Sequence, residues 1–112
     1  MTARGAAIVG VGGLGAPAAV VLAASGATAL TLIDDDVVES SNLPRQPIYD
    51  VADVGTPKVE AAARRLRAHH PELRVTAVRA RVDADNAPAL LAGHAVILDG
   101  TDGLPGKAML ND

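Results

Sequence analysis

A chain of 112 residues, 49% of them hydrophobic, can form one domain with a buried core. It contains no cysteine, which excludes disulfides, cysteine-bound zinc and a thiol nucleophile, and its net charge of -3 argues against a nucleic-acid partner. No apolar run approaches the roughly 20 residues that a membrane span requires, and the N-terminus has no signal-peptide pattern. We therefore expect a cytoplasmic protein without a membrane partner.

A strand, a glycine-rich turn and a helix open the chain. Ala6 to Val11 is apolar throughout, as in a strand covered on both faces, and a helix is predicted over Leu14 to Ala24. Between them lies the spacing Gly10-x-Gly12-x-x-Gly15, which is typical of a turn that binds phosphate. The first glycine permits the tight turn, the second lets the backbone approach phosphate, and the third lets the helix pack closely on the strand.

A second apolar strand is predicted over Ala29 to Ile33, and it ends at Asp34. The order of strand, turn, helix and strand implies a right-handed parallel crossover. Asp34 would then lie beyond the glycine turn, where a carboxylate meets the ribose hydroxyls of a nucleotide. The alternative is that Asp34 caps a loop or a helix.

A long polar loop, Asp35 to Val54, follows, and loops of this length inside a domain are functional or disordered. It contains Asn42 and Arg45, and Lys58 comes in the first turn of the next helix. Basic side chains that converge on phosphates are what an ATP-cleaving site needs, because they neutralise developing negative charge.

These charged residues also have structural interpretations. The run of three aspartates from Asp34 to Asp36 repels itself, so at least one of them should point to solvent or find a cation. Arg45 could simply pair with Asp36, and Lys58 with Glu60 or solvent. Six arginines between residues 64 and 81 are interpreted as a solvated face, since no aromatic residues interleave them.

The rest of the chain predicts two more strands and three more helices. A helix begins with Thr56 as its N-cap and Pro57 as its first residue, and it ends at His69-His70-Pro71. A strand is predicted over Arg74 to Arg81, followed by a short helix over Asp85 to Leu91 with Asp85 or Asn86 as its cap. A strand over Ala95 to Leu98 and a last helix that starts near Leu104 or Pro105 complete the chain. The predicted fold is a single α/β domain over residues 1–112. It has a Rossmann-like parallel sheet with helices on both faces, in strand order 3-2-1-4, truncated after about four strands.

Two acidic residues, Asp99 and Asp102, follow the fourth predicted strand. They would lie at the crevice where strand order reverses, and a carboxylate there could hold magnesium against phosphates. The alternative is that Thr101 or Asp102 caps the last helix.

The pattern as a whole resembles the ThiF/MoeB/HesA family, the bacterial relatives of ubiquitin-activating enzymes. The resemblance covers nearly the whole chain and rests on five motifs in the right order and spacing. They are Gly10-x-Gly12-Gly13-x-Gly15, Leu32-Ile33-Asp34-x-Asp36, Ser41-Asn42-Leu43-x-Arg45-Gln46, Val54-Gly55-x-x-Lys58 and Asp99-x-Thr101-Asp102.

The resemblance implies an enzyme that uses ATP and Mg²⁺, and no zinc, to adenylate the C-terminal glycine of a ubiquitin-like sulfur-carrier protein. It implies that backbone amides at Gly12 and Gly13 approach the phosphates and that Asp34 holds the ribose. Asn42, Arg45 and Lys58 would bind phosphates, with Arg45, Lys58 and Asp102 in the catalytic set and Asp102 as the metal ligand. A homodimer is also implied, and it would cover area exposed at the fourth strand.

The sequence departs from the family pattern in several places. Gly103 stands where relatives usually carry asparagine, and the family's N-terminal arginine and its cysteine-bearing second half have no counterpart. Without cysteine, adenylation is the last step expected of this chain. Two alternatives remain open: an NAD-binding oxidoreductase domain that shares the glycine turn and Asp34, and a non-catalytic remnant that acts as an interaction module.

Overall fold

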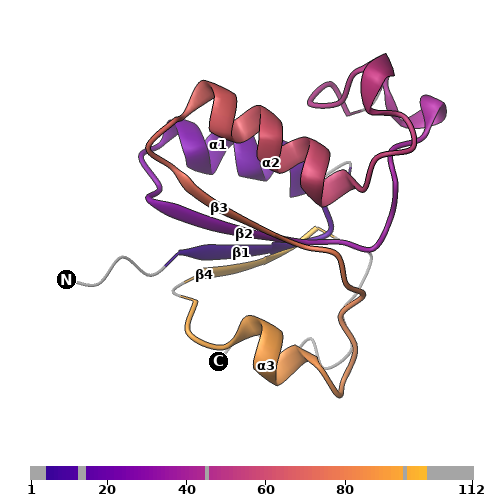
Figure 1. Cartoon of the computed structure of the whole chain (residues 1–112). Helices are drawn as coiled ribbons and strands as arrows, with labels where there is room; N and C mark the ends of the chain where they lie inside the picture. The colour runs from indigo at the N-terminus through magenta and orange to yellow at the C-terminus, as the bar shows by residue number, and fades with distance from the viewer. Residues whose placement is uncertain (1–4, 13–14, 45, 95, 101–112) are drawn as a thin grey trace.

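The computed structural model describes residues 5–12, 15–44, 46–94 and 96–100. In these ranges four strands alternate with three α-helices (Figure 1). In chain order they are β1 (Ala6–Val9), α1 (Gly15–Ala24), β2 (Ala29–Ile33), α2 (Lys58–His69), β3 (Arg74–Val78), α3 (Ala87–Leu91) and β4 (Val96–Asp99). Two short 3-10 turns, η1 (Ser40–Asn42) and η2 (Val51–Asp53), lie in the loop between β2 and α2.

The four strands form one parallel sheet in the order β3-β2-β1-β4, which confirms the predicted topology. Val9, the last residue of β1, stands opposite Ile33 of β2 and Asp99 of β4. The carboxyl ends of these three strands therefore meet at one edge. Strand order reverses between β1 and β4, and ligands of open α/β sheets bind in the crevice outside such a reversal.

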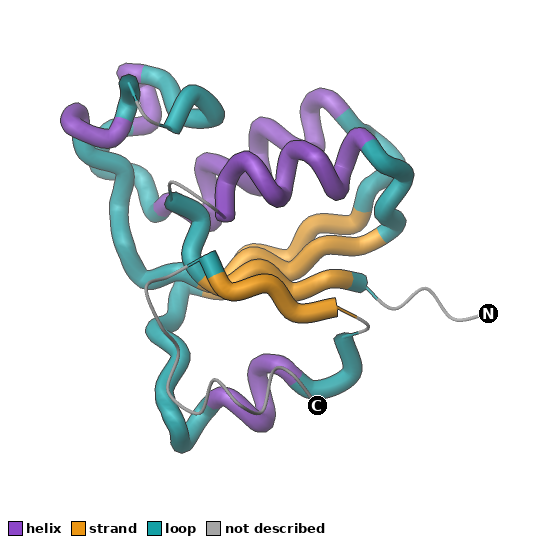
Figure 2. The backbone as a smooth tube through the Cα atoms, turned by 180° about the vertical axis from the view of Figure 1, so that it is seen from behind, coloured by secondary structure: helices purple, strands orange, loops and turns teal. Residues whose placement is uncertain are grey.

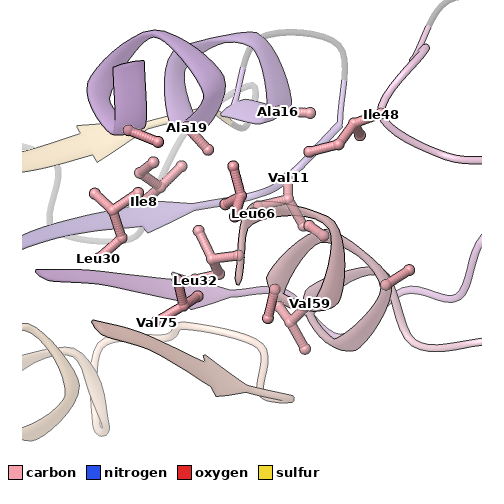
Figure 3. Close-up of a cluster of buried hydrophobic side chains, with 14 of the residues drawn as sticks. Ile8, Val11, Ala16, Ala19, Leu30, Leu32, Ile48, Val59, Leu66 and Val75 are labelled. Carbon is pink, nitrogen blue, oxygen red and sulfur yellow. The ribbon is translucent and has the colours of Figure 1, made fainter. Parts of the chain in front are cut away.

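Helices cover both faces of the sheet, as predicted. α1 and α2 lie together on one face and α3 lies on the other, as opposite views show (Figures 1 and 2). The larger core cluster fills the space beneath α1 and α2, and Val11, Ala16 and Ile48 belong to it (Figure 3). A smaller cluster, which includes Ile33, Ala87 and Leu91, fills the space above α3.

The two long helices, α1 and α2, differ in the polarity of the faces that point away from the sheet. The predicted apolar face of α2 is buried, as Val59, Ala62, Ala63 and Leu66 show. α1 carries no charged residue, and its outer face exposes Pro17, Val20, Val21 and Ala24. No helix in the described ranges is long and apolar enough to cross a membrane.

β3 is the outer strand on one side of the sheet, and a helix side chain covers part of its free edge. Arg67 reaches from α2 and donates a hydrogen bond from Nη2 to the carbonyl of Val75, at 2.6 Å. The neighbouring residues Arg74 and Val78 instead pair through their backbones with Thr28 and Asp34, on the β2 side. The Val75 carbonyl therefore faces away from the sheet and is satisfied by the chain's own arginine.

The starts of two helices differ from the prediction, because acceptors other than the predicted caps bind the N–H groups there. α2 begins at Lys58, and Thr56 is not its cap. The Lys58 N–H donates to the Asp36 carbonyl instead, at 2.9 Å. α3 begins at Ala87 with Asn86 at the N-cap position, as one of the two alternatives predicted, but the Asn86 side chain makes no capping hydrogen bond.

The strands also differ from their predicted lengths. β1 ends at Val9, because Gly10 turns the chain with a φ of +87°. β3 ends at Val78 rather than at residue 81, although the Ala80 N–H still bonds to the Asp34 carbonyl. β4 runs to Asp99, and the helix expected from residue 104 lies outside the described residues.

Candidate functional site

The glycine turn sits at the carboxyl edge of the sheet, packed between β1, α1 and the end of β4. Gly10 donates from its N–H to the Ile33 carbonyl at 2.7 Å. A Cβ on Gly15 would lie 1.6 Å from the Gly10 carbonyl oxygen, and one on Gly100 would lie 2.5 Å from the same atom. Gly15 and Gly100 therefore allow α1 and the end of β4 to close around the turn.

Asp34 links the end of β2 to the glycine turn. Its Oδ2 accepts a hydrogen bond from the Val11 N–H, and its Oδ1 accepts one from the Asp36 N–H, both at 2.8 Å. Asp34 therefore caps the start of the loop after β2, as the alternative interpretation of this residue predicts. A carboxylate has about four lone-pair sites, so two such bonds leave acceptor capacity for ribose hydroxyls. Ribose binding by Asp34 stays a prediction.

Three residues from separate segments converge beside the turn: Gly12, Gln46 and Lys58. A Cβ on Gly12 would lie 3.6 Å from Gln46 Nε2 and 3.8 Å from Lys58 Nζ. These are ordinary contact distances, so among the described residues the position of a Cβ on Gly12 is bordered by two nitrogen atoms and has room for a methyl group. Gln46 and Lys58 are 8% and 7% exposed, which is unusual for such polar side chains.

The charge on Lys58 is not neutralised by the ion pairs that the sequence made plausible. The ion pairs found among described residues are Arg64–Asp53, at 3.6 Å, and Arg65–Asp50. Lys58 is buried, so its ammonium group is not solvated on the surface, and it forms no ion pair with Glu60. Because burying an unpaired charge is costly, this arrangement favours an anionic ligand at Gly12.

The amide of Gln46 adds to this interpretation. Its Oε1 is buried and has no hydrogen-bond partner in the part of the chain that the structure describes, although such groups are normally satisfied. Its backbone is fixed by a bond from its N–H to the Asn42 carbonyl, at 2.9 Å. Sequence reasoning placed Gln46 in a motif without giving it a role. Its position directly after Arg45 was the available signal.

A buried tyrosine, also missed from the sequence, lies under the turn. Tyr49 is 3% exposed, and its hydroxyl donates to the Val11 carbonyl at 2.6 Å. Burial raises the pKa of this hydroxyl well above its usual range, and the negative charges of Asp34 and Asp53 raise it further. As the only aromatic residue in the chain, placed in a polar loop, Tyr49 was a detectable exception.

The other predicted site residues are placed as follows. Asn42 uses its Oδ1 to accept the Glu39 N–H at 2.8 Å, which caps η1, and no contact joins it to Gly12 or Lys58 in the described ranges. Gly13, Arg45 and Asp102 lie outside the described residues. Asp102 comes two residues after Gly100, whose N–H bonds to the Val9 carbonyl at 2.7 Å.

The run of aspartates is divided between the glycine turn, which Asp34 contacts, and the exposed surface. The carboxylates of Asp34, Asp35 and Asp36 can each place an oxygen within 4.8 Å of the others. Asp35 and Asp36 are exposed, as the self-repulsion of the run predicts for at least one of its members. Exposed acidic groups of this kind do not by themselves define a metal site.

The fold and the site define the class of protein. A parallel sheet in the order 3-2-1-4, with a glycine turn and a buried lysine at its crevice, is a Rossmann-like domain. The profile of the ThiF family matches residues 2–112. The chain belongs to the ThiF family.

Two curated relatives show how much of such proteins this chain covers. It is 50% identical over 105 residues to the SAMP-activating enzyme E1 of Haloferax volcanii, covering 94% of this chain and 39% of that protein. It is 45% identical over 104 residues to the molybdopterin-synthase adenylyltransferase of Salmonella typhimurium, and the match covers 93% of this chain and 42% of that protein. The chain thus spans about two fifths of the length of these relatives.

Solved structures show the same fold. The tRNA N6-threonylcarbamoyladenosine dehydratase TcdA of E. coli, solved in complex with ATP, matches with a TM-score of 0.86 and 40% identity, over 96% of this chain and 44% of that one. E. coli MccB, solved with a MccA peptide derivative, matches with a TM-score of 0.82 and 29% identity, over 88% and 29%.

Proposed function

We propose that the chain is the ATP-binding part of an adenylyltransferase that activates the C-terminal glycine of a ubiquitin-like sulfur-carrier protein. The observation that carries this proposal is the buried Lys58, which pairs with no acidic side chain among the described residues and whose Nζ lies beside Gly12. Family membership and the names of the relatives support adenylation over the oxidoreductase alternative. A cytoplasmic location fits a reaction that consumes ATP.

In the proposed reaction, a carboxylate oxygen of the carrier's terminal glycine attacks the α-phosphorus of ATP. A phosphorus–oxygen bond forms, and the bond from that phosphorus to the oxygen bridging to the β-phosphate breaks. The leaving oxygen keeps the electron pair, so the products are an acyl adenylate and pyrophosphate. Negative charge grows on the phosphate oxygens, and preorganised cations and N–H donors stabilise it.

The residues take the following roles in this proposal. Amides at Gly12 and Gly13 face the phosphates, Asp34 holds the ribose, Asn42 and Arg45 bind phosphates, and Lys58 supplies a charge from within the core. Asp102 is the proposed ligand of a Mg²⁺ ion, which would neutralise phosphate charge. Gln46 joins this set, because its amide borders the same space as Lys58.

The test is exchange of labelled pyrophosphate into ATP, with and without a sulfur-carrier protein. We expect exchange that requires the carrier and falls at least tenfold in Lys58→Met, which keeps the length of the side chain but removes its charge. Arg45→Ala should behave similarly. Arg74→Met removes an exposed cation and serves as the matched control, with exchange unchanged.

Other outcomes distinguish the alternatives. If exchange is absent but ATP raises the melting temperature, and Asp34→Ala abolishes that rise, the chain binds nucleotide without catalysing adenylation. If neither signal is seen, it is a remnant of the fold that acts as an interaction module. If tRNA stimulates AMP formation and a carrier protein does not, the substrate is a tRNA and not a sulfur-carrier protein.

A homodimer is also proposed, as the family resemblance implies. The outer face of α1 supports it, because Val20 and Val21 are 44% and 62% exposed and have apolar neighbours on the same face. A helix that is hydrophobic all round is usually buried. A second copy of the chain would cover this face.

A further inference from the structure

We propose that Tyr49 is a positioning residue of the nucleotide site, and that its hydroxyl fixes the direction of the Gly12 N–H. Tyr49 does not border the space at Gly12. It acts through the Val11 carbonyl, to which its hydroxyl donates at 2.6 Å. The functional part of this inference rests on the proposed ATP site.

The geometry of the peptide bond connects Tyr49 to Gly12. The Val11 carbonyl and the Gly12 N–H belong to one planar peptide group, and in a trans peptide they point in opposite directions. No cis peptide is found in the described ranges. Because Tyr49 holds the carbonyl on the core side, the Gly12 N–H faces the other way.

Both peptide groups of Val11 are held from outside the turn. Its N–H donates to Asp34 Oδ2 at 2.8 Å, while its carbonyl accepts from Tyr49. The Gly12 carbonyl, in the next peptide group, accepts a hydrogen bond at 3.1 Å from the N–H of Ala16 at the start of α1. The three bonds together fix the backbone from Val11 through Gly12.

This support matters because the glycines of the turn restrict its backbone conformation little by themselves. Gly10 and Gly12 flank Val11, and glycine allows far more backbone conformations than other residues. An N–H donor contributes most to binding an anion when its direction is set before the ligand arrives. The hydroxyl of Tyr49 supplies that preorganisation, and burial keeps it protonated as a donor.

The test compares Tyr49→Phe, which removes only the hydroxyl, with Ser25→Ala. Ser25 also donates to a backbone carbonyl, that of Val21, at 2.7 Å, but at the far end of α1. We expect Tyr49→Phe to shift the amide ¹⁵N resonance of Gly12 while that of Gly26 stays in place. ATP affinity should fall about three- to tenfold in Tyr49→Phe and remain unchanged in Ser25→Ala.

The two readouts separate this inference from the proposed function. A Gly12 resonance that does not move overturns the inference, whether or not ATP binds. A Gly12 shift with unchanged ATP affinity overturns its functional part. If the wild-type chain binds no ATP, the proposed function fails, and the Gly12 resonance still decides whether Tyr49 sets the turn.

A further measurement needs no variant. The hydroxyl proton of Tyr49 should exchange slowly enough with water to be observed by NMR, with a nuclear Overhauser effect to the backbone of residues 11 and 12. This measurement covers the case in which Tyr49→Phe does not fold. A hydroxyl proton in fast exchange with water would contradict the bond to Val11 and overturn the inference.

Discussion

Gly12 and Gly15 belong to the same turn, but they are glycine for different reasons. At Gly15 an added Cβ would lie 1.6 Å from the Gly10 carbonyl oxygen, so packing of α1 on β1 excludes any side chain. At Gly12 the nearest atoms of described residues to a Cβ would be at 3.6 and 3.8 Å, and the φ of Gly12 is outside the left-handed region. The fold therefore tolerates a methyl group at Gly12, whereas a ligand there would not.

This difference gives a paired prediction. Gly15→Ala should destabilise the chain by more than about 2 kcal/mol, because backbone must move to admit the methyl group. Gly12→Ala should unfold near the wild-type temperature but lose at least tenfold in ATP affinity, since the methyl group fills the space beside Lys58. Thermal melting with and without ATP measures both effects.

The opposite pattern would contradict this account. A Gly12→Ala variant that is strongly destabilised would make the glycine a packing requirement. A variant that binds ATP normally would show that the backbone at residue 12 does not approach the ligand.

At the scale of elements, helix ends show where sequence reasoning fails. Thr56 looked like the N-cap of α2, but backbone groups of the preceding loop satisfy that end, with the Asp36 carbonyl accepting the Lys58 N–H. Before α3, Oδ1 of Asp83 accepts the N–H groups of Asp85 and Asn86, at 2.9 and 2.8 Å. Asp36 lies 22 residues before Lys58, so local sequence cannot reveal this partner. Asp83 lies only two or three residues before the N–H groups that it accepts, and local sequence offered it as well as Asp85 and Asn86.

These two ends predict different responses to loss of a side chain. Asp83→Ala should lower the free energy of unfolding by about 1 kcal/mol, because it removes the acceptor for two N–H groups before α3. Thr56→Ala should change it by less than about 0.5 kcal/mol, since the side chain does not cap α2. Urea denaturation distinguishes them, and equal losses would restore Thr56 as a cap.

For the whole molecule, the order and type of the helices and strands could be predicted from the sequence. Only some of the residues that line the candidate site could be predicted. Apolar strands, the glycine turn and the crossover rule lead to the sheet order 3-2-1-4 that the structure has. Asp34 and Lys58 became candidates through their positions, at the end of the second strand and in the first turn of the helix after the polar loop. Gln46 and Tyr49 were missed because their burial depends on how the loop after β2 folds over the turn, which no periodicity encodes.

The outer face of α1 leads to a prediction about assembly. Val21→Glu places a charge on the more exposed of the two valines of that face and should convert a dimer to a monomer, because the charge would be buried in the interface. Ala68→Glu, at an exposed position on α2, is the control and should remain dimeric. Sedimentation equilibrium measures both, and a monomeric wild-type chain would contradict the proposal.

The bond from Arg67 to the outer edge of β3 has a consequence for how the protein behaves at high concentration. A strand edge with open carbonyls can recruit strands from other molecules, and this growth leads to fibrils. At Val75 the position is already taken by a bulky cation, which also repels an identical edge. Concentrated protein should therefore resist ordered aggregation on this side, and removal of Arg67 would expose the edge to it.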